Sequence, residues 1–468
     1  MKKILSLAAV AFCTMAVAQT PCSGGSAAGY PCSGFDLQSH LSLGQLQASG
    51  GNDSWGWVDP NDGKEYAMMG VNNGTVFIDI SDPVNPVYLG KLPTHTSNSS
   101  WRDIKVYDNH AFIVSEANGH GMQVFDLTRL RNVNNPPVTF NNDAHYSGFG
   151  SAHNIAINED TGYAYAIGTN NFNGGPEFIN IQNPQNPVSA GGYSLDGYTH
   201  DAQIVTYDGP DTDYTGREIF VGSNENEVVI VDVTDKGSPT PIAVIDYTNV
   251  GYTHQGWFTE DKRYFIVGDE LDEFSVGFNT RTLIFDFSDL DNPQFDFEYF
   301  GATPATDHNG YVVGDKFYMA NYAAGLRVYD LSDLANENIS EYGYFDTFPG
   351  SNGAGFDATW NVYPFFPSGN IVISGDEGFT VVRDPNLSTG DFEGTDFAMY
   401  PNPATDVLTI TAKDTTIDEV AIYNVLGQRV LGFNFSNSPS EKINISELNS
   451  GVYLVQINKN TSKRLIVN

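Results

Sequence analysis

Short runs of alternating apolar and polar residues recur along most of the chain, and polar turns separate them. Residues 154–158 and 163–167 form two such runs around a turn at 160–162, and a third, β-branched run follows at 178–181. Alternation with a period of two is typical of half-buried β-strands, and turns rich in Asp, Asn, Gly and Pro end them. The pattern predicts a protein built almost entirely from short strands.

The same group of runs repeats roughly every 50 residues, a spacing typical of repeat folds built from small sheets. Each repeat opens with a Trp or His that has a Ser or Thr immediately before it or two residues earlier. The seven opening residues are Trp55, Trp101, His153, His200, His254, His308 and Trp360. Four strands in each of seven repeats predict an all-β, seven-bladed β-propeller.

The ring is expected to close with strands from both ends of the chain. The seventh repeat runs from Trp360 to Arg383 and lacks an obvious outer strand. The apolar run at residues 40–46 can supply that strand, so we expect it to fasten the ring. The propeller is then expected to span residues 36–384.

A different pattern follows the propeller. Residues 385–396 are rich in Asp, Gly and Thr and are expected to form a linker. Residues 397–468 show alternating strands with turns that contain Gly, which predicts a small β-sandwich large enough to fold alone.

The first residues have the three-part pattern of a secretory signal. Lys2 and Lys3 precede an apolar stretch, and Ala16-Val17-Ala18 offers a cleavage site of small residues, so residues 1–18 are expected to be removed. The apolar stretch is too short to span a bilayer, and no later segment of the sequence is long enough. The mature chain is therefore expected to be exported and to have no transmembrane segment.

Cys22 and Cys32 lie close together in the expected amino-terminal segment 19–35. In an oxidising compartment such a pair most simply forms a local disulfide that fastens this segment. A metal-binding or redox pair is the alternative, and the absence of further cysteines in the mature chain favours the disulfide.

The charge is strongly acidic and unevenly placed. The chain has 57 acidic and 22 basic residues, and residues 19–395 hold 50 of the acidic but only 14 of the basic ones. Such a surface repels phosphate backbones, so nucleic acid is not expected to be a partner.

The tail closely resembles the type A carboxy-terminal sorting domain of type IX secretion. The resemblance rests on a Tyr-Pro-Asn-Pro start, a Gly-Gln turn and a Gly-Val-Tyr strand, which in this chain are Tyr400, Pro401, Asn402, Pro403, Gly427, Gln428, Gly451 and Tyr453. It implies passage through the periplasm, contact with the type IX secretion machinery, and a secreted or outer-surface-attached product.

The body resembles the choice-of-anchor B family, whose propeller repeats are named for a Leu-Val-Ile-Val-Asp strand. The resemblance extends from about Cys22 to about Arg383, and it is carried by phrases such as Trp55-Gly56-Trp57, Tyr198-Thr199-His200-Asp201 and Tyr252-Thr253-His254-Gln255-Gly256-Trp257. Family members share the body and differ in their surface anchor. The resemblance implies fold and location, and it supplies no agreed reaction.

Four histidines form the main candidate site. His153, His200, His254 and His308 open four consecutive repeats, and equivalent positions in a propeller surround its central channel. If they face the axis, four imidazoles could hold a transition metal such as iron, copper or zinc. The alternative is a purely structural role, because Trp occupies the same position in the other three repeats.

Acidic residues offer a second type of metal site. They recur after the second strand of several repeats, at Glu116, Glu225, Asp269 with Glu270, and Asp376 with Glu377, where carboxylates could bind Ca²⁺. The run at 208–213 also resembles a Ca²⁺ loop but lacks the regular ligand spacing. In a chain this acidic, solvated loop carboxylates are the simpler interpretation.

These features favour a non-catalytic, exported propeller that binds a surface protein, a glycan or another ligand through its loops and channel mouth. The alternative is a metal-dependent enzyme, for example an oxidoreductase, centred on the four histidines. The enzyme requires the four rings to converge within ligand distance around an open coordination position, whereas the binding module does not.

Overall fold

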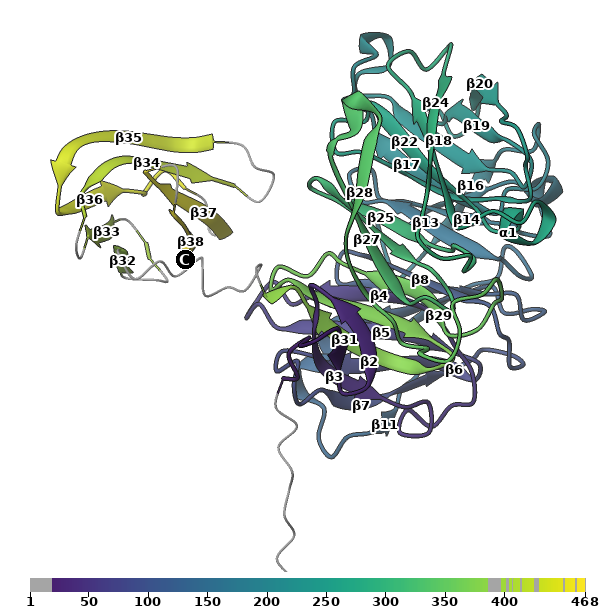
Figure 1. The fold of residues 1–468 in the computed structure, drawn as a ribbon, viewed down its shortest axis with the longest axis horizontal. Coiled ribbons are helices and arrows are strands. Elements are labelled where there is room, and N and C mark those ends of the chain that lie inside the picture. The colour runs from purple at the N-terminus through teal and green to yellow at the C-terminus, as the bar shows by residue number, and fades with distance from the viewer. Residues whose placement is uncertain are drawn as a thin grey trace, which may run out of the picture. The chain divides into compact units, whose positions relative to one another are not determined.

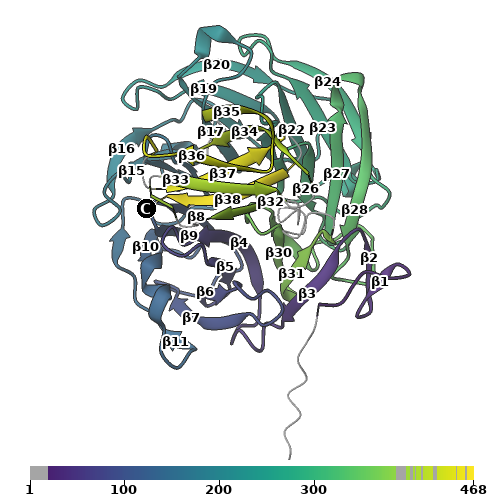
Figure 2. The ribbon, with the colours of Figure 1, turned by 90° about the vertical axis from the view of Figure 1, so that its left-hand side faces the viewer.

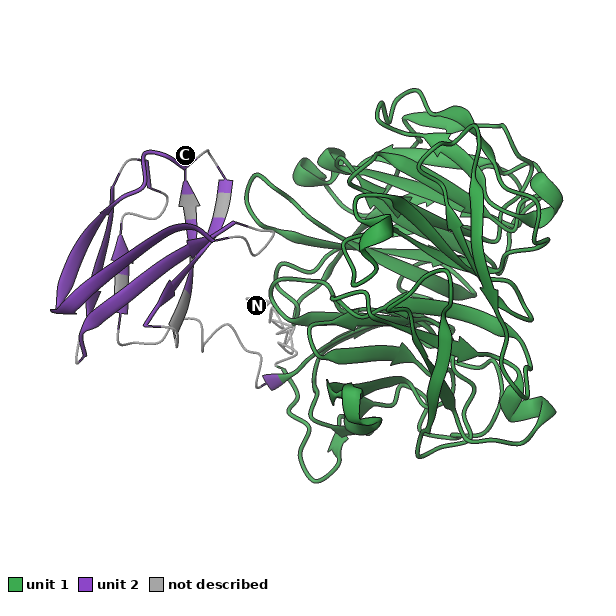
Figure 3. Ribbon diagram, turned by 90° about the horizontal axis from the view of Figure 1, so that it is seen from above, with its two compact units in different colours: residues 1–384 green, residues 385–468 purple. Residues whose placement is uncertain are grey.

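A computed structural model describes residues 19–385, 397–400, 404–405, 407–412, 415–424, 429–448, 451–458 and 461–467. The chain divides into two compact units, residues 1–384 and 385–468 (Figure 3). The predicted signal at 1–18 and most of the predicted linker, residues 386–396, lie outside the described residues.

Unit 1 is a β-propeller, so the all-β propeller prediction is confirmed. Within residues 19–385 the structure has seven sheets, and in Figure 2 they follow one another in chain order around a common centre. The innermost strands contact each other in an unbroken circuit that runs through β4, β8, β13, β17, β21, β25 and β29 and returns to β4.

The sheets are built from consecutive antiparallel strands (Figure 1). The first three sheets contain β4 (Gly51–Val58), β5 (Glu65–Val71), β6 (Gly74–Asp79) and β7 (Val87–Pro93); β8 (Arg102–Tyr107), β9 (His110–Ser115), β10 (Met122–Asp126) and β12 (Ala144–Tyr146); and β13 (Asn154–Asn158), β14 (Tyr163–Ile167), β15 (Glu177–Asn180) and β16 (Val188–Gly192). The short strand β11 (Val138–Thr139) pairs in parallel with β7.

The next two sheets have the same order. They contain β17 (Asp201–Thr206), β18 (Glu218–Ser223), β19 (Val228–Asp232) and β20 (Thr240–Ile245), and β21 (Thr253–Phe258), β22 (Tyr264–Asp269), β23 (Arg281–Asp286) and β24 (Gln294–Phe300).

The last two sheets also take strands from the amino terminus. One contains β25 (Gly310–Val313), β26 (Lys316–Ala320), β27 (Leu326–Asp333) and β28 (Asn338–Phe345), extended by β2 (Tyr30–Ser33) and β1 (Ser26–Ala27); the other contains β29 (Thr359–Tyr363), β30 (Asn370–Gly375), β31 (Gly378–Arg383) and β3 (Asp36–Leu41).

The strand that completes the last sheet differs from the expected segment. The sequence predicts that residues 40–46 pair there, but β3 begins at Asp36 and ends at Leu41. Leu43 and Leu46 instead pack into the apolar cluster between the first and last sheets. The apolar period alone cannot separate a strand from the turn that packs beneath it.

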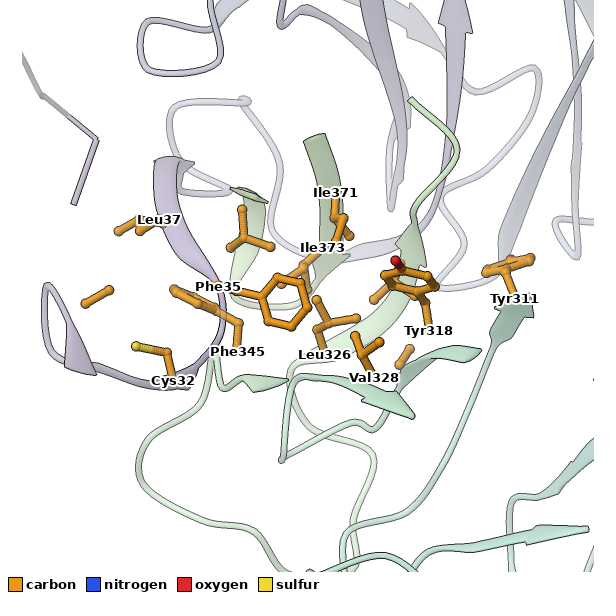
Figure 4. Close-up of a cluster of buried hydrophobic side chains, with 14 residues drawn as sticks. Cys32, Phe35, Leu37, Tyr311, Tyr318, Leu326, Val328, Phe345, Ile371 and Ile373 are labelled. Carbon is orange, nitrogen blue, oxygen red and sulfur yellow. The ribbon is translucent and has the colours of Figure 1, made fainter. Parts of the chain in front are cut away.

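Buried side chains hold the amino-terminal segment to the last two sheets (Figure 4). Phe35 and Leu37 pack with Phe345, Leu326 and Ile373, and all five are at least nine-tenths buried. Burying side chains of this size contributes about 1.5–3 kcal/mol each, so this cluster stabilises the joined ends. Cys32 belongs to the same cluster, and its disulfide with Cys22 fastens the segment.

Unit 2 contains two sheets that share one apolar core. One sheet has the strands β32 (Phe397–Tyr400), β33 (Val407–Ala412) and β36 (Ser440–Asn444), and the other has β35 (Arg429–Ser438), β34 (Ile417–Tyr423), β37 (Gly451–Ile457) and β38 (Thr461–Val467). Leu408, Ile422, Val455 and Leu465 are fully buried between them. Two sheets packed over one core form the expected β-sandwich.

Helices are few and short in the described residues. They are α1 (Asp272–Ser275) and the 3₁₀ turns η1 (Leu127–Asn132), η2 (Phe172–Gly174), η3 (Thr212–Tyr214) and η4 (Leu334–Asn336). Across the described residues, none of the helices has the length and apolar character needed to cross a membrane.

Candidate functional site

A belt of polar side chains links neighbouring inner strands around the channel. Asp103 Oδ2 accepts a hydrogen bond from the Ile155 amide at 2.8 Å, and Asn154 Nδ2 donates to Asp201 Oδ2 at 2.7 Å. Further around the ring, Gln255 Oε1 accepts from an inner-strand amide of the next blade. These bonds fix the inner strands relative to each other, so side chains just before and after the belt are held in register.

The four predicted histidines lie side by side on one side of this belt. Neighbouring ring centres are 4.1 Å apart for His153 and His200, 4.2 Å for His200 and His254, and 4.3 Å for His254 and His308. Trp360 continues the row, with its ring centre 4.8 Å from that of His308. We call the four histidines the histidine row.

Hydrogen bonds orient most of the row. The Nδ1 atoms of His200 and His308 donate to the carbonyl oxygens of His254 and Trp360, respectively. His153 Nδ1 lies 2.6 Å from Glu116 Oε1. Because Nδ1 carries the proton in His200 and His308, their Nε2 atoms keep a free lone pair when the rings are neutral.

Burial keeps three of these rings neutral. It lowers the pKa of His254 and that of His308 to about 3, and it lowers the pKa of His200 well below its usual value, with neighbouring histidines adding to the effect. An unprotonated imidazole is the form that binds metal ions.

The row does not form a four-histidine centre. Among the described side chains, no three of the four histidines bring ring nitrogens within 4.8 Å of one another, whereas His254 and His308 do so together with Glu270. His254 Nε2 and His308 Nε2 lie 3.8 and 3.9 Å from the Glu270 carboxylate. The four imidazoles follow the curve of the channel, so the first and the last lie too far apart to bind one ion. Only neighbouring imidazoles can share an ion.

The other acidic residues that the sequence suggested as metal ligands differ in their contacts. Glu225 Oε1 accepts from the Tyr252 hydroxyl, and Asp376 Oδ1 accepts from the Gly51 amide. In the loop at 208–213, Asp211 comes close to Asp289 and Asp291. These three carboxylates are largely exposed, and a charged cluster of this kind is common on an acidic surface.

Trp55 does not occupy the position that its repeat predicted. The small pocket beside the histidine row is lined by Asp53 from the first blade, together with Trp101 and Trp360, and Trp55 lies in a different cavity. Trp55 stands two residues after Asp53, as Trp257 stands two residues after Gln255, so Trp55 is equivalent to Trp257 and not to the histidines.

That second cavity was not predicted from the sequence. It lies on the other side of the polar belt and has a volume of about 330 Å³. Its lining combines aromatic, aliphatic and polar side chains, namely Trp55, Lys105, Val106, Ala156, Ile157, Glu159, Asp201, Ala202, Gln203, Ile204, Gln255, Trp257, Tyr311, Tyr363 and Phe365. We call it the aromatic cavity.

Edge-to-face contacts fix the aromatic wall. Trp55 packs against Tyr311 and Tyr363 with ring centres 5.9 and 5.1 Å apart, and Trp257 packs against Tyr311 at 4.9 Å. The Tyr311 hydroxyl donates to Asn361 Oδ1 at 2.9 Å. Such pairs add about 0.5–1.5 kcal/mol each beyond their burial, so the wall is rigid before any ligand arrives.

A compact charged group forms another part of the wall. Lys105 Nζ lies 2.7 Å from Asp103 Oδ1 and 3.8 Å from Asp53 Oδ2. Burial disfavours the charge on Lys105, but the two carboxylates outweigh it and raise its pKa. Burial also raises the pKa of Asp201 to about 7, which places a titrating carboxyl at the cavity. Strongly shifted groups in a cleft are candidates for functional residues.

A sequence signal for the aromatic cavity did exist. Trp257 stands two residues after Gln255 of the polar belt, Lys105 two after Asp103, and Tyr363 two after Asn361. Side chains two apart on a strand share a face, so these residues point to the same side of the belt.

Comparison with known families identifies both parts of the chain. Residues 398–468 match the model of the secretion system C-terminal sorting domain, and residues 64–94 and 216–246 match the LVIVD repeat. The chain carries LVIVD repeats and a carboxy-terminal sorting domain. The two LVIVD matches cover β5 to β7 and β18 to β20, the three outer strands of two blades.

The sorting domain directs export by type IX secretion to the cell surface or the medium. Of its predicted motif, Tyr400, Gly451 and Tyr453 lie in β32 and β37. Pro401, Asn402, Pro403, Gly427 and Gln428 lie outside the described residues.

A curated relative matches only a short stretch. An endo-acting ulvan lyase of Formosa agariphila is 36% identical over 76 residues, which is 15% of each protein. The chain thus spans about 15% of the length of that relative.

Several solved structures are similar at low identity. The β-propeller domain of Cps50 (Swd1) from Myceliophteria thermophila has a TM-score of 0.46 at 10% identity and covers 74% of this chain and 99% of its own. A protein from Lactobacillus plantarum has a TM-score of 0.47 at 14% identity and covers 81% of this chain and 99% of its own. A third similar structure is PorZ of Porphyromonas gingivalis, a surface component of the type IX secretion system. It has a TM-score of 0.43 at 14% identity and covers 89% of this chain and 58% of its own.

Proposed function

We propose that the LVIVD propeller is an extracellular binding module that holds its ligand in the aromatic cavity after type IX secretion. The observation that carries the proposal is the cavity itself, a preformed hollow of about 330 Å³ with an aromatic wall and a few convergent polar groups. Ligand sites are typically about 300–1,000 Å³ and have this composition.

The chemistry of the wall favours a neutral glycan. Rings such as Trp55 and Trp257 offer flat apolar faces for the C–H faces of a sugar, while Gln203 and Gln255 can bond its hydroxyl groups. The charge of Lys105 is already balanced by Asp53 and Asp103, and Asp201 adds a further acidic group. An anionic sugar would therefore find no unpaired cation in this wall and is disfavoured.

The mature chain, residues 19–468, can be tested on a glycan array and then by titration calorimetry. We expect a neutral saccharide to bind, and Trp257→Ala to weaken its binding at least tenfold. Trp101→Ala is the matched control, because Trp101 is 43% exposed and lines the pocket beside the histidine row instead. Equal affinity of the Trp257→Ala variant and the wild type would contradict the proposal.

The metal-dependent enzyme is the weaker candidate. It requires four converging imidazoles, and the described histidines lie in a row in which only two share a close group with a carboxylate. Membership of the choice-of-anchor B family stays a prediction from the sequence and agrees with a secreted binding module.

A further inference from the structure

We propose that His254, Glu270 and His308 bind one divalent first-row transition-metal ion at the histidine end of the channel, a site separate from the aromatic cavity. The donors are the Nε2 atoms of the two imidazoles and a carboxylate oxygen of Glu270. Two nitrogens and one carboxylate form a donor set of the kind that binds zinc and iron in proteins.

The distances suit an ion between these groups better than hydrogen bonds between them. The two Nε2 atoms lie 3.8 and 3.9 Å from the carboxylate oxygens, which is beyond hydrogen-bond range. Metal–ligand bonds of about 2.0–2.2 Å place two tetrahedral ligand atoms roughly 3.3–3.6 Å apart. The three donor atoms already lie within 4.8 Å of one another, so the side chains need only draw together around the ion.

Outer hydrogen bonds orient two of the three ligands. His308 donates its Nδ1 proton to the Trp360 carbonyl, which leaves the Nε2 lone pair facing Glu270. Tyr322 donates to Glu270 Oε1 at 2.8 Å and holds that carboxylate in place. Partners of this kind position metal ligands and raise their basicity.

His254 is the ligand whose surroundings most need an ion. Its side chain is 2% exposed, Nδ1 has no hydrogen-bond partner among the described residues, and Nε2 lies 3.8 Å from Glu270 Oε2. A buried imidazole without a partner is costly, and a metal bond to Nε2 would give this ring one strong interaction.

The surroundings also favour a cation with room for a further ligand. Asp269 and Asp307 directly precede Glu270 and His308 in the chain and are buried, and both carboxylate oxygens of Asp307 lack a hydrogen-bond donor among the described residues. Arg281 is engaged by Asp269 and Asp272. The adjoining pocket, lined in part by His254 and His308, has a volume of about 20 Å³, enough for one water molecule.

The test uses the mature chain, freed of metal with a chelator and titrated with Zn²⁺ by calorimetry and with Co²⁺ by visible absorption. We expect one Zn²⁺ per chain and a Co²⁺ spectrum of low coordination number with nitrogen ligands. Glu270→Gln and His308→Ala should each weaken Zn²⁺ binding at least tenfold. His153→Ala is the control, because it removes an imidazole of the same row that lies outside the proposed ligand set.

Two further variants keep the result decisive. Asp289→Asn tests the exposed group formed with Asp211 and Asp291, and it should leave Zn²⁺ binding unchanged. Glu270→Gln decides the case if His308→Ala does not fold, as judged by circular dichroism. The proposal is overturned if the wild type binds no Zn²⁺ or if folded Glu270→Gln binds it with wild-type affinity. Because Trp257 lies outside the ligand set, Trp257→Ala should keep its Zn²⁺, so failure of the glycan proposal leaves this test intact.

Discussion

Lys105 of the second blade lies against Trp55 of the first, with its Nζ atom 4.5 Å from the centre of the indole ring. The same ammonium group contacts Asp103 on its own strand and Asp53 on the neighbouring one. One buried cation therefore joins two blades, two carboxylates and the aromatic cavity.

Replacing Lys105 by Met should destabilise the propeller by about 3–5 kcal/mol, because the buried carboxylates lose their cation. Urea unfolding followed by circular dichroism measures this. Lys64→Met is the control, since Lys64 pairs with Asp62 at the surface and such pairs contribute less than about 1 kcal/mol. A Lys105→Met variant as stable as the control would show that the pair adds little.

Asp201 should make stability depend on pH. Burial raises its pKa in the folded chain to about 7, above the unfolded value, so the folded state favours the protonated form. The contribution of Asp201 to the free energy of unfolding is fully present below the unfolded pKa of about 4, and it is lost as the pH rises through 7. Relative to the Asp201→Asn variant, the free energy of unfolding of the wild type should fall by on the order of 1.4 kcal/mol per pH unit between about pH 5 and 7. Parallel stability curves for the two proteins would refute the assignment.

The disulfide should contribute to the stability of the joined ends. Cys22 and Cys32 are ten residues apart. Closing a loop of this length raises the free energy of the unfolded chain by about 3 kcal/mol, because it lowers the entropy of that chain. The double variant Cys22→Ser/Cys32→Ser should lower the free energy of unfolding by about that amount, whereas a reductant should change the variant no further. An unchanged midpoint in urea would mean that the packing of Phe35 and Leu37 suffices.

Gly56 supports the aromatic wall from behind. A Cβ atom at this position would lie 2.2 Å from the Tyr363 ring and 2.6 Å from that of Phe366. Gly56→Ala should therefore cost about 1–3 kcal/mol and weaken ligand binding by displacing Tyr363. Gly350→Ala is the control, because nothing lies within 4 Å of a Cβ there. The comparison needs thermal unfolding and calorimetry on both variants.

The sequence predicted the all-β propeller, the sorting domain and the shared height of the four histidines in the ring. Period-two alternation identifies strands, and a repeat places equivalent residues at equivalent heights around a ring. For this reason the spacing along the chain suffices to group His153, His200, His254 and His308.

Which of these side chains meet depends on the folding of the whole ring. Trp55 lies in the aromatic cavity and not beside the histidine row, and Glu270 joins His254 and His308 in a close group that does not include His153. Trp55, Trp257 and Tyr363 come from three blades and form one wall only after the ring closes. Spacing along a strand fixes the face of a side chain, whereas distances between blades depend on local bulges and on closure of the whole ring.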